Sequence, residues 1–517
     1  MLTTFLLIAL AWGGQPPVAP PAPLRVAVAG GVLEGSLSAH GIRQFRGVPY
    51  AAPPVGHRRW QPPQPAAAWA GVRPARKFGP RPMQLPLYGD MNFRSDSMSE
   101  NCLYLNVWTG ASTARERRPV LVYFYGGGFG AGDGSEPRYD GEALARQGIV
   151  TVTVNYRLGV FGFLAHPDLV QESAQHAAGN YGLLDQQAAL RWIHANVTAF
   201  GGDPTRITIA GESAGSVSVS AQLAAPGSRG LFAQAIGESG SLLSPDRAPR
   251  PLAEATQAGA LLAAAGQPAA PRFRPVVDGY FLTEAPLATY SAGRQAHVPL
   301  LVGWNSAEVG YPSLLGSQPP TLASYRAAVA QAYGEQAAQV LAAYPASTDA
   351  EVPGVATDLA TDRFTAYATW KWATLHTQTS GQPVYRYLYA HPRPPMRPEL
   401  GNAVPGLAGG IIRRNDAPPA PPASGAVHSA EIEYALGNLT TNHVYAWTAE
   451  DYRLSTFLQD YFVAFIKTGN PNGNSRPNWP AATRPPSGQT MLLDVAPRAA
   501  TEPHPARYHL LDHLAGN

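Results

Sequence analysis

The sequence is short of cysteine and of charge, and each shortage excludes a class of protein. Its single cysteine, Cys102, rules out an intrachain disulfide and hence a disulfide scaffold. This cysteine lies in the apolar run CLYLNVW, so we expect a small buried side chain there. Charged residues make up only 14% of the 517 residues, and the formal net charge is +3. No run of lysine or arginine approaches the roughly five to eight residues of a basic patch, so we expect no nucleic-acid partner.

Long apolar runs are also missing, except at the start of the chain. Residues 2–12 form an apolar run followed by small residues, which is too short to cross a bilayer but has the length of a signal-peptide core. Residues 15–24 are rich in proline and indicate an extended linker. We therefore predict a signal peptide over residues 1–14, no stable membrane span, and a secreted or periplasmic protein. No lysine or arginine precedes the apolar run, so a disordered or membrane-tethered N-terminus is the alternative.

Hydrophobic residues, in contrast, make up 45% of the chain and occur in a regular order. Between about residues 25 and 304, short β-rich runs alternate with helical stretches, which predicts an α/β fold with a mostly parallel central sheet flanked by helices. The β-rich runs are PVLVYFY, GIVTVTVNY, RITIAGES and VPLLVGWN. We treat residues 25–517 as a single catalytic domain.

Three further segments have distinct patterns. In LLDQQAALRWIHANV the apolar residues share one helical face, and a stripe of apolar and aromatic residues over 454–466 also has helical spacing. We expect both helices to pack against the core, and we assign no chemistry to the aromatic stripe. Residues 391–426 are dense in proline, glycine and alanine, which predicts a long irregular surface loop.

The segment RITIAGESAG has the pattern of a nucleophile elbow. A predicted strand runs into Gly211, Glu212, Ser213, Ala214 and Gly215, and a helix-competent stretch follows. The two glycines allow the sharp strand-to-helix turn that exposes a serine hydroxyl. Such a pentapeptide is common by chance in a glycine-rich chain. The interpretation therefore depends on the predicted strand before it and on candidate catalytic partners elsewhere in the chain.

A serine nucleophile also needs donors for the oxyanion that its attack creates. YFYGGGFGAG follows a predicted strand and supplies Gly126, Gly127 and Gly128, whose backbone amides are free of side-chain obstruction. Together with the amide of Ala214 they would form an oxyanion hole. The alternatives are a turn with no ligand or a phosphate loop, but the sequence has no strict GxGxxG or Walker pattern.

These motifs together resemble those of the type B carboxylesterases, a family that includes the cholinesterases. FGGDPTRITIAGESAG, SENCLYLNVW, VNYRLGVFGFLA and KTGNPNG resemble recurring segments of this family. The resemblance implies the α/β-hydrolase fold, ester hydrolysis by Ser213, and oxyanion donors at Gly127 and Gly128. It also implies that Ser239 supports the site, that the substrate is a small ester, and that neither a cofactor nor a metal ion takes part. It implies nothing about oligomeric state.

The family orders its triad as serine, acid and histidine, and this order locates the two partners of the serine. LVGWNSAEVG resembles the loop of the triad acid, which makes Glu308 the acid, although Ala307 and Val309 replace the family's usual aspartate and glycine. The acid would orient the histidine and stabilise its charged form.

Residue type alone does not choose the base, because seven histidines follow the predicted acid. GAVHSAEIEYALGN resembles the histidine segment of the family, which implies that His428 is the base and Glu431 a supporting carboxylate. The rival is His443. A histidine with an ordinary pKa of about 6.5 can accept the serine proton near neutral pH.

Three details concern the substrate. In cholinesterases an acidic residue at the position of Glu212 favours cationic substrates, and a buried hydrogen-bond acceptor is the alternative role here. The choline-binding tryptophan is missing from GDMNFRSDSMS, so we do not expect choline esters. The stretch between Ser239 and Arg274 is short, with room for one helix near residues 252–265, and we expect an open acyl side that accepts branched or aromatic groups. The alternative is that the proline-rich loop closes this side.

Two other functions use a similar sequence. An amidase or a transacylase would use the same triad. A non-catalytic, cholinesterase-like binding protein would share the fold, but such proteins typically lose the serine or the histidine, and both are present here.

Overall fold

The computed structural model describes residues 24–265, 273–413, 425–473, 476–482 and 488–516. The predicted signal peptide and nearly all of the predicted linker lie outside these residues. Within the described residues, no helix is both long and apolar enough to cross a membrane.

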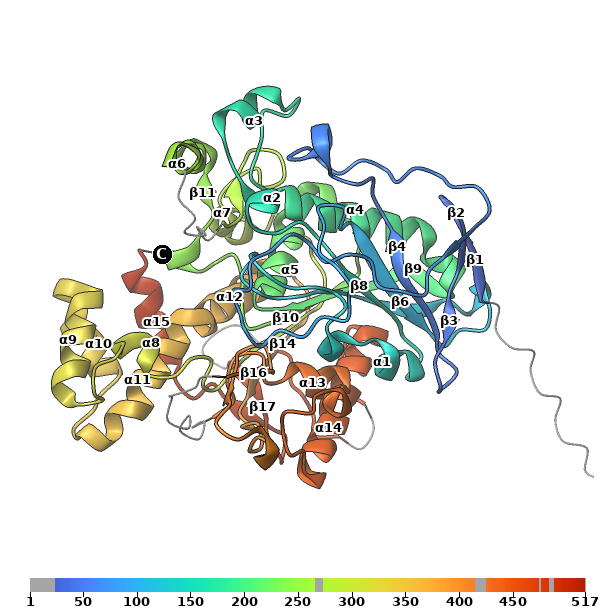
Figure 1. The fold of residues 1–517 in the computed structure, drawn as a ribbon. Helices are drawn as coiled ribbons and strands as arrows, with labels where there is room; N and C mark the ends of the chain where they lie inside the picture. The colour runs from blue at the N-terminus through green and yellow to red at the C-terminus, as the bar shows by residue number, and fades with distance from the viewer. Residues whose placement is uncertain (1–23, 266–272, 414–424, 474–475, 483–487, 517) are drawn as a thin grey trace, which may run out of the picture.

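An 11-stranded mixed sheet forms the centre of the structure, in the order β18-β17-β14-β13-β10-β9-β7-β8-β6-β4-β3 (Figure 1). The strands from β17 to β8 in this order are parallel, whereas β18, β6, β4 and β3 pair antiparallel at the two edges. The predicted, mostly parallel sheet is therefore confirmed. The strands are β3 (Ser36–Leu37), β4 (Arg43–Pro49), β6 (Tyr104–Thr109), β7 (Arg118–Phe124), β8 (Val150–Val154), β9 (Gly202–Glu212), β10 (Gln234–Glu238), β13 (Leu300–Asn305), β14 (Val384–Tyr389), β17 (Gln489–Leu493) and β18 (Arg498–Thr501).

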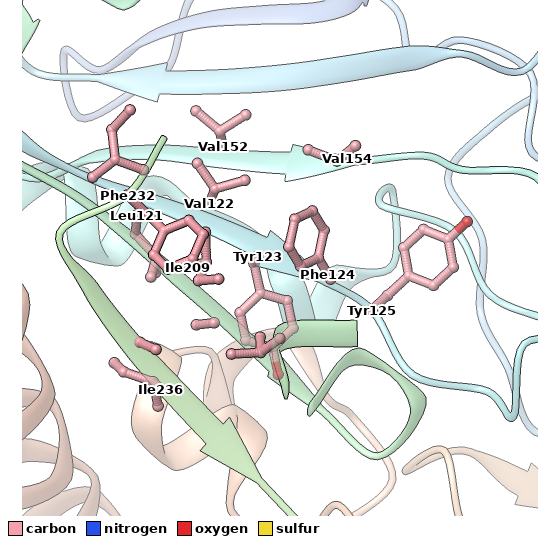
Figure 2. Close-up of a cluster of buried hydrophobic side chains, with 14 of the residues drawn as sticks. Leu121, Val122, Tyr123, Phe124, Tyr125, Val152, Val154, Ile209, Phe232 and Ile236 are labelled. Carbon is pink, nitrogen blue, oxygen red and sulfur yellow. The ribbon is translucent and has the colours of Figure 1, made fainter. Parts of the chain in front are cut away.

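The central strands are buried because both faces of the sheet are covered. All five residues of β8 and all six of β13 are buried. In the core, Val122 of β7 is paired with Val152 of β8 on one side and with Ile209 of β9 on the other, and Phe124 is paired with Val154 (Figure 2). The four β-rich runs identified in the sequence are β7, β8, β9 and β13.

Helices pack on both faces of this sheet (Figure 1). α4 and α5 cover one face, and α1 and α14 cover the other. Both predicted core-facing helices are confirmed: α4 buries Leu183, Leu190 and Ile193, and α14 buries most of its aromatic stripe. The helices are α1 (Glu142–Arg146), α2 (Gly159–Phe163), α3 (Pro167–Glu172), α4 (Tyr181–Asn196), α5 (Ala214–Ala224), α6 (Leu252–Ala265), α7 (Pro286–Ser291), α8 (Pro312–Leu315), α9 (Leu322–Tyr333), α10 (Ala337–Ala343), α11 (Val352–Thr361), α12 (Tyr367–Thr379), α13 (Ile432–Leu436), α14 (Ala449–Thr468) and α15 (Pro505–Leu514).

Smaller elements surround this core. β1 (Arg25–Val28), β2 (Gly31–Glu34) and β5 (Val72–Pro74) form a separate sheet. β11 (Arg250–Pro251) pairs with β12 (Val276–Val277), and α6 lies between them in the sequence, where one helix was predicted. In the proline-rich segment, β15 (Val404–Pro405) pairs with β16 (Ile411–Ile412). α8 to α11 share a hydrophobic cluster of their own around Tyr325, Val329 and Leu359.

The parallel strands place the chemistry-bearing loops at one edge of the sheet. The glycine loop follows β7, the GESAG turn follows β9, the segment with Ser239 follows β10, and the loop with Glu308 follows β13. Neighbouring parallel strands end at the same edge, and ligand sites in open α/β sheets lie outside this carboxyl edge. The fold therefore brings together residues that are far apart in the sequence.

Candidate active site

Ser213 occupies a strained turn between β9 and α5. Its backbone has φ 56° and ψ −120°, and its amide donates a hydrogen bond of 2.8 Å to the carbonyl of Glu238. A side chain at either flanking glycine would not fit: a Cβ on Gly211 would lie 2.5 Å from the backbone of Gly215, and one on Gly215 would lie 2.0 Å from the carbonyl oxygen of Phe124. The turn holds a partly exposed serine at the start of a helix, which is the geometry of a nucleophile elbow.

The glycine loop supplies backbone amides beside this serine. Gly127 and Gly128 have φ of +117° and +62°, and a Cβ on Gly127 would lie 2.0 Å from the carbonyl oxygen of Ala131. Within the described residues, the amides of Gly127, Gly128 and Ala214 donate no intramolecular hydrogen bond. Because these residues line cavities that also contain Ser213, their amides are available to an oxygen bound there.

His428 and Glu308 are joined by a short contact. Nδ1 of His428 lies 2.6 Å from Oε2 of Glu308, and the backbone amide of His428 donates to the carbonyl of Glu308 at 3.0 Å. The other carboxylate oxygen of Glu308 accepts a hydrogen bond of 2.8 Å from the amide of Asn305. Both side chains are buried, at 8% and 0% exposure. The carboxylate is thus fixed on its loop and fixes the imidazole in turn.

Glu431 is linked to the His428 and Glu308 pair through the side chain of Asn305. Nδ2 of Asn305 donates to Oε2 of Glu431 at 2.6 Å and to the carbonyl of Val427 at 2.8 Å. Asn305 therefore ties the end of β13 to the segment that carries His428. The sequence analysis did not identify Asn305, whose only signal is its place at the end of a strand three residues before Glu308.

Glu212 lies on the other side of the imidazole. Its Oε1 is 3.1 Å from Nε2 of His428, although the two atoms do not meet in hydrogen-bond geometry. No hydrogen bond joins the Ser213 hydroxyl to His428 within the described residues, but both residues line one cavity together with Glu212. In apo structures catalytic hydrogen bonds are often long or poorly aligned, so this geometry is compatible with a serine–histidine pair.

The carboxylates shift the proton affinities of the site. Burial alone would lower the pKa of His428, but the charges of Glu212 and Glu308 outweigh burial and raise that pKa to about 9. Burial raises the pKa of Glu212, which the charges of His428 and Arg138 only partly oppose. Burial, together with the charges of Glu212 and Glu308, raises the pKa of Glu431 to about 8. These carboxyl groups and the imidazole therefore hold protons more firmly than they would in water.

Two cavities, each of about 100 Å³, meet at Ser213. Both are also lined by Gly128, Arg247 and Phe364. The ring of Phe364 packs edge-on against His428 at 4.9 Å between centroids, and the guanidinium of Arg247 lies 4.6 Å from the Phe364 ring. The sequence analysis identified neither residue, and Phe364 lies in a single π-helical turn, Asp362–Ala366, that no sequence pattern indicated.

The predicted site residues fall into groups. Ser213, Glu308, His428, Glu212, Gly127, Gly128 and Ala214 surround one centre, and Ser239 lines one of the two cavities. Ser239 is buried with φ 57°, and its Oγ has no hydrogen-bond partner within the described residues. The rival histidine, His443, is exposed. No described group of three or more His, Cys, Asp or Glu side chains is arranged to hold a metal ion.

The sequence is similar to proteins that are named as esterases. Residues 22–264 and 249–511 match the model of the carboxylesterase family. The chain is 34% identical to a fumonisin B1 esterase of Sphingopyxis macrogoltabida, over 89% of this chain and 87% of the relative. It is also 34% identical to a para-nitrobenzyl esterase of Bacillus subtilis, over 88% of this chain and 92% of the relative.

Solved structures agree with the sequence relatives. A PNB esterase superposes with a TM-score of 0.76 at 29% identity, over 94% of this chain and 99% of that chain. A carboxylesterase of Geobacillus stearothermophilus superposes with a TM-score of 0.76 at 30% identity, with the same coverage. The chain therefore belongs to the carboxylesterase family, has the α/β-hydrolase fold and is a serine carboxylic-ester hydrolase.

Proposed function

We propose that this enzyme cleaves carboxylic esters through an acyl-enzyme intermediate on Ser213, with His428 as general base and Glu308 as the acid that orients it. One observation supports the proposal most directly. A strained serine, a buried histidine–glutamate pair and backbone amides without intramolecular acceptors all lie at the same two cavities. Cys102, the single cysteine of the chain, is not a rival nucleophile, because it is buried and burial raises the pKa of its thiol.

In the first half of the reaction, the hydroxyl of Ser213 attacks the ester carbonyl as His428 takes its proton. The amides of Gly127, Gly128 and Ala214 donate hydrogen bonds to the oxyanion. The carbon–oxygen bond to the alcohol then breaks, and His428 returns the proton to the departing alkoxide. In the second half, water repeats these steps against the acyl-enzyme and releases the carboxylic acid.

Whether His428 can act as a base depends on the protonation state of the Glu212–His428 pair. A protonated imidazole cannot accept the serine proton, and the pKa of about 9 belongs to a site in which the neighbouring carboxylates are charged. We infer that Glu212, whose pKa burial raises, holds a proton when His428 is neutral. Both groups are then uncharged in a site where desolvation disfavours charge.

The test is loss of the serine hydroxyl. Ser213→Ala should lower kcat/KM for a p-nitrophenyl ester by roughly a thousandfold or more, because members of a catalytic triad act as a unit. It should also abolish covalent labelling by an organophosphate, read as intact protein mass. Ser112→Ala, at an exposed serine that lines neither cavity, is the control. Undiminished turnover or labelling of Ser213→Ala would refute the proposal. Comparison of kcat/KM for an ester and for the amide of the same acid shows whether the enzyme also cleaves amides.

We also propose that the enzyme is exported. The support is the apolar run over residues 2–12, followed by small residues and a proline-rich stretch. Expression of the full chain in a bacterial host, followed by N-terminal sequencing of the protein from the periplasm and the medium, tests this. Export should yield a chain that begins after about residue 14. An uncleaved chain confined to the cytoplasm would contradict it.

A further inference from the structure

The place of the departing alcohol follows from the role of His428 in the proposed function, on which this inference rests. His428 returns its proton to the alkoxide, so the alcohol has to lie in a cavity that His428 lines. Of the two cavities at Ser213, one is lined by His428 and the other is not. We call the cavity that His428 lines the alcohol cavity.

Large apolar and aromatic side chains surround the alcohol cavity. Tyr88, Met91 and Leu407 line this cavity and not the other, whereas Phe364 lines both. None of the four side chains is fully buried, and Leu407 is 41% exposed. They therefore keep surface that a bound apolar group can cover, and removal of this surface from water favours binding.

Leu407 belongs to the proline-rich segment over residues 391–426. The strands β15 and β16 pair within this segment, and the amide of Gly406 donates to the carbonyl of Gly410 at 3.0 Å across the turn between them. Among the described residues of the segment, Leu407 and Ala408 line the alcohol cavity, and none lines the other cavity. The tip of this hairpin, residues 406–410, therefore faces the place of the alcohol.

Asp90 fastens the hairpin tip to the loop that carries Tyr88 and Met91. Its Oδ2 accepts hydrogen bonds from the amides of Ala408 at 2.6 Å and Gly410 at 3.2 Å, and the residue is 4% exposed. The two segments are in close contact, since a Cβ on Gly410 would lie 2.0 Å from the carbonyl oxygen of Asp90. Hydrogen bonds to a buried carboxylate are strong, so this contact fixes the hairpin tip relative to the loop.

The hairpin tip is also bonded to the segment of the base. The hydroxyl of Ser429, the residue after His428, donates to the carbonyl of Leu407. Nδ2 of Asn442 donates to the carbonyl of Gly409 at 3.0 Å. The backbone of Leu407 is therefore held in place, although its side chain is partly exposed.

We propose that the hairpin selects the alcohol of the ester: Leu407, positioned by Asp90, favours esters of apolar alcohols such as butanol over methyl esters. A methyl group covers little of the surrounding side chains, whereas a longer chain lies against them and gains roughly fourfold for each methylene that it buries. Asp90 lines neither cavity, so it acts through the hairpin as a positioning residue.

The hairpin acts on one half of the reaction. The alcohol occupies its cavity until the bond between the carbonyl carbon and the alcohol oxygen has broken and His428 has delivered the proton. Water then attacks an acyl-enzyme from which the alcohol has departed. The hairpin should therefore change the rate of acylation and leave attack by water unchanged.

Methyl acetate and n-butyl acetate are the probes, because both form the same acyl-enzyme. We expect kcat/KM, followed by pH-stat titration, to be at least about tenfold higher for butyl acetate. Leu407→Ala should lower this ratio by roughly fivefold, while kcat/KM for methyl acetate stays within about twofold of the parent value. Leu85→Ala, at a leucine that is 54% exposed and lines neither cavity, is the matched control and should leave the ratio unchanged.

Variants of Asp90 test its positioning role. Asp90→Ala removes both hydrogen bonds to the hairpin and should lower the ratio about as much as Leu407→Ala. Asp90→Asn keeps one acceptor oxygen and should retain part of the preference. Addition of Leu407→Ala to Asp90→Ala should lower the ratio little further, because the two residues act on the same contact. An equal loss for both esters in the Asp90 variants would contradict a positioning role.

Acyl transfer provides a second measurement that does not depend on which step limits kcat. With p-nitrophenyl acetate in equal concentrations of methanol and n-butanol, the alcohol attacks the acyl-enzyme in the reverse of the acylation step. The initial rate of butyl acetate formation should exceed that of methyl acetate by about tenfold, and Leu407→Ala should reduce this excess as it reduces the kinetic ratio.

The outcomes separate this inference from the proposed function. A butyl-to-methyl ratio near one in the parent enzyme, or a ratio that Leu407→Ala leaves unchanged or raises, overturns the role of the hairpin. The acyl-enzyme proposal then survives if Ser213→Ala still abolishes turnover of both esters. Turnover of both esters by Ser213→Ala would instead remove the proposed function, and this inference with it.

Discussion

Nε2 of His428 lies 3.1 Å from a carboxylate oxygen of Glu212, the residue directly before the predicted nucleophile, while its Nδ1 lies 2.6 Å from Glu308. The imidazole is thus held between two buried carboxyl groups. Glu308 fixes its orientation, whereas Glu212 occupies the side from which a proton must be exchanged with the serine. The charge of Glu212 therefore influences the pKa of His428, the proposed base.

Removal of that charge should change the pH dependence of the rate. In Glu212→Gln the imidazolium loses one of the carboxylates that stabilise it, so the pKa of His428 falls below its value of about 9. The acid limb of the kcat/KM profile should move to lower pH, and the rate below this limb should rise relative to the plateau. Glu254→Gln, an exposed change on α6, should not move the limb. A shift to higher pH would show that Glu212 does not stabilise the imidazolium.

Glu431 should make stability depend on pH. Its pKa is raised from 4.5 to about 8 on folding, so the folded chain binds a proton more tightly than the unfolded chain. This contribution is fully present below pH 4.5 and is lost as pH rises toward about 8. Glu431→Gln removes the titration but keeps an acceptor for Asn305. The decline of Tm between about pH 5 and 8 should therefore be shallower in the variant than in the parent; equally steep declines would contradict the assignment.

Gly128 should tolerate a side chain poorly. Its φ of +62° disfavours other residues, and a Cβ would lie 3.1 Å from the hydroxyl oxygen of Tyr88. Displacement of one oxyanion donor costs on the order of a hundredfold in kcat, so Gly128→Ala should lower kcat with little change in KM. Adding Tyr88→Phe removes the contacting hydroxyl and should recover part of the rate. An effect on KM alone would place this loop outside the oxyanion hole.

The two candidate bases should behave differently. His428→Ala leaves Ser213 without a proton acceptor and should be as damaging as loss of the serine. His443 is exposed, so His443→Ala should keep most of the activity, as measured with a p-nitrophenyl ester. The reverse result would assign the base to His443.

Much of the fold follows from local patterns in the chain. The runs that became β7, β8, β9 and β13 are short and rich in β-branched and other apolar residues, as expected of buried strands, and α4 and α14 carry their apolar stripes at helical spacing. The glycine loop, the GESAG turn and the loop with Glu308 each follow a parallel strand, and such strands end at one edge. Glu308 and His428 themselves were assigned from the resemblance to the family. The openness of the acyl side stays a prediction.

Other features depend on how distant segments meet. Phe364 lies in a π-helical turn and packs against the imidazole, and Arg247 packs on the Phe364 ring from a segment more than 100 residues away in the sequence. The contact between Glu212 and His428 joins the end of β9 to a loop that is more than 200 residues away in the sequence, and no periodicity encodes that contact. For this reason the sequence predicted an ordinary histidine pKa, near 6.5, whereas the surrounding carboxylates raise it to about 9.

The central claim is that one acyl-enzyme on Ser213 is common to all substrates of a given acid. Hydrolysis of the ethyl, phenyl and p-nitrophenyl esters of one acid, in a fixed concentration of methanol, tests it most directly. A shared acyl-enzyme loses its leaving group before water or methanol attacks, so the ratio of methyl ester to free acid should be the same for all three. A ratio that changes with the leaving group would contradict the acyl-enzyme mechanism.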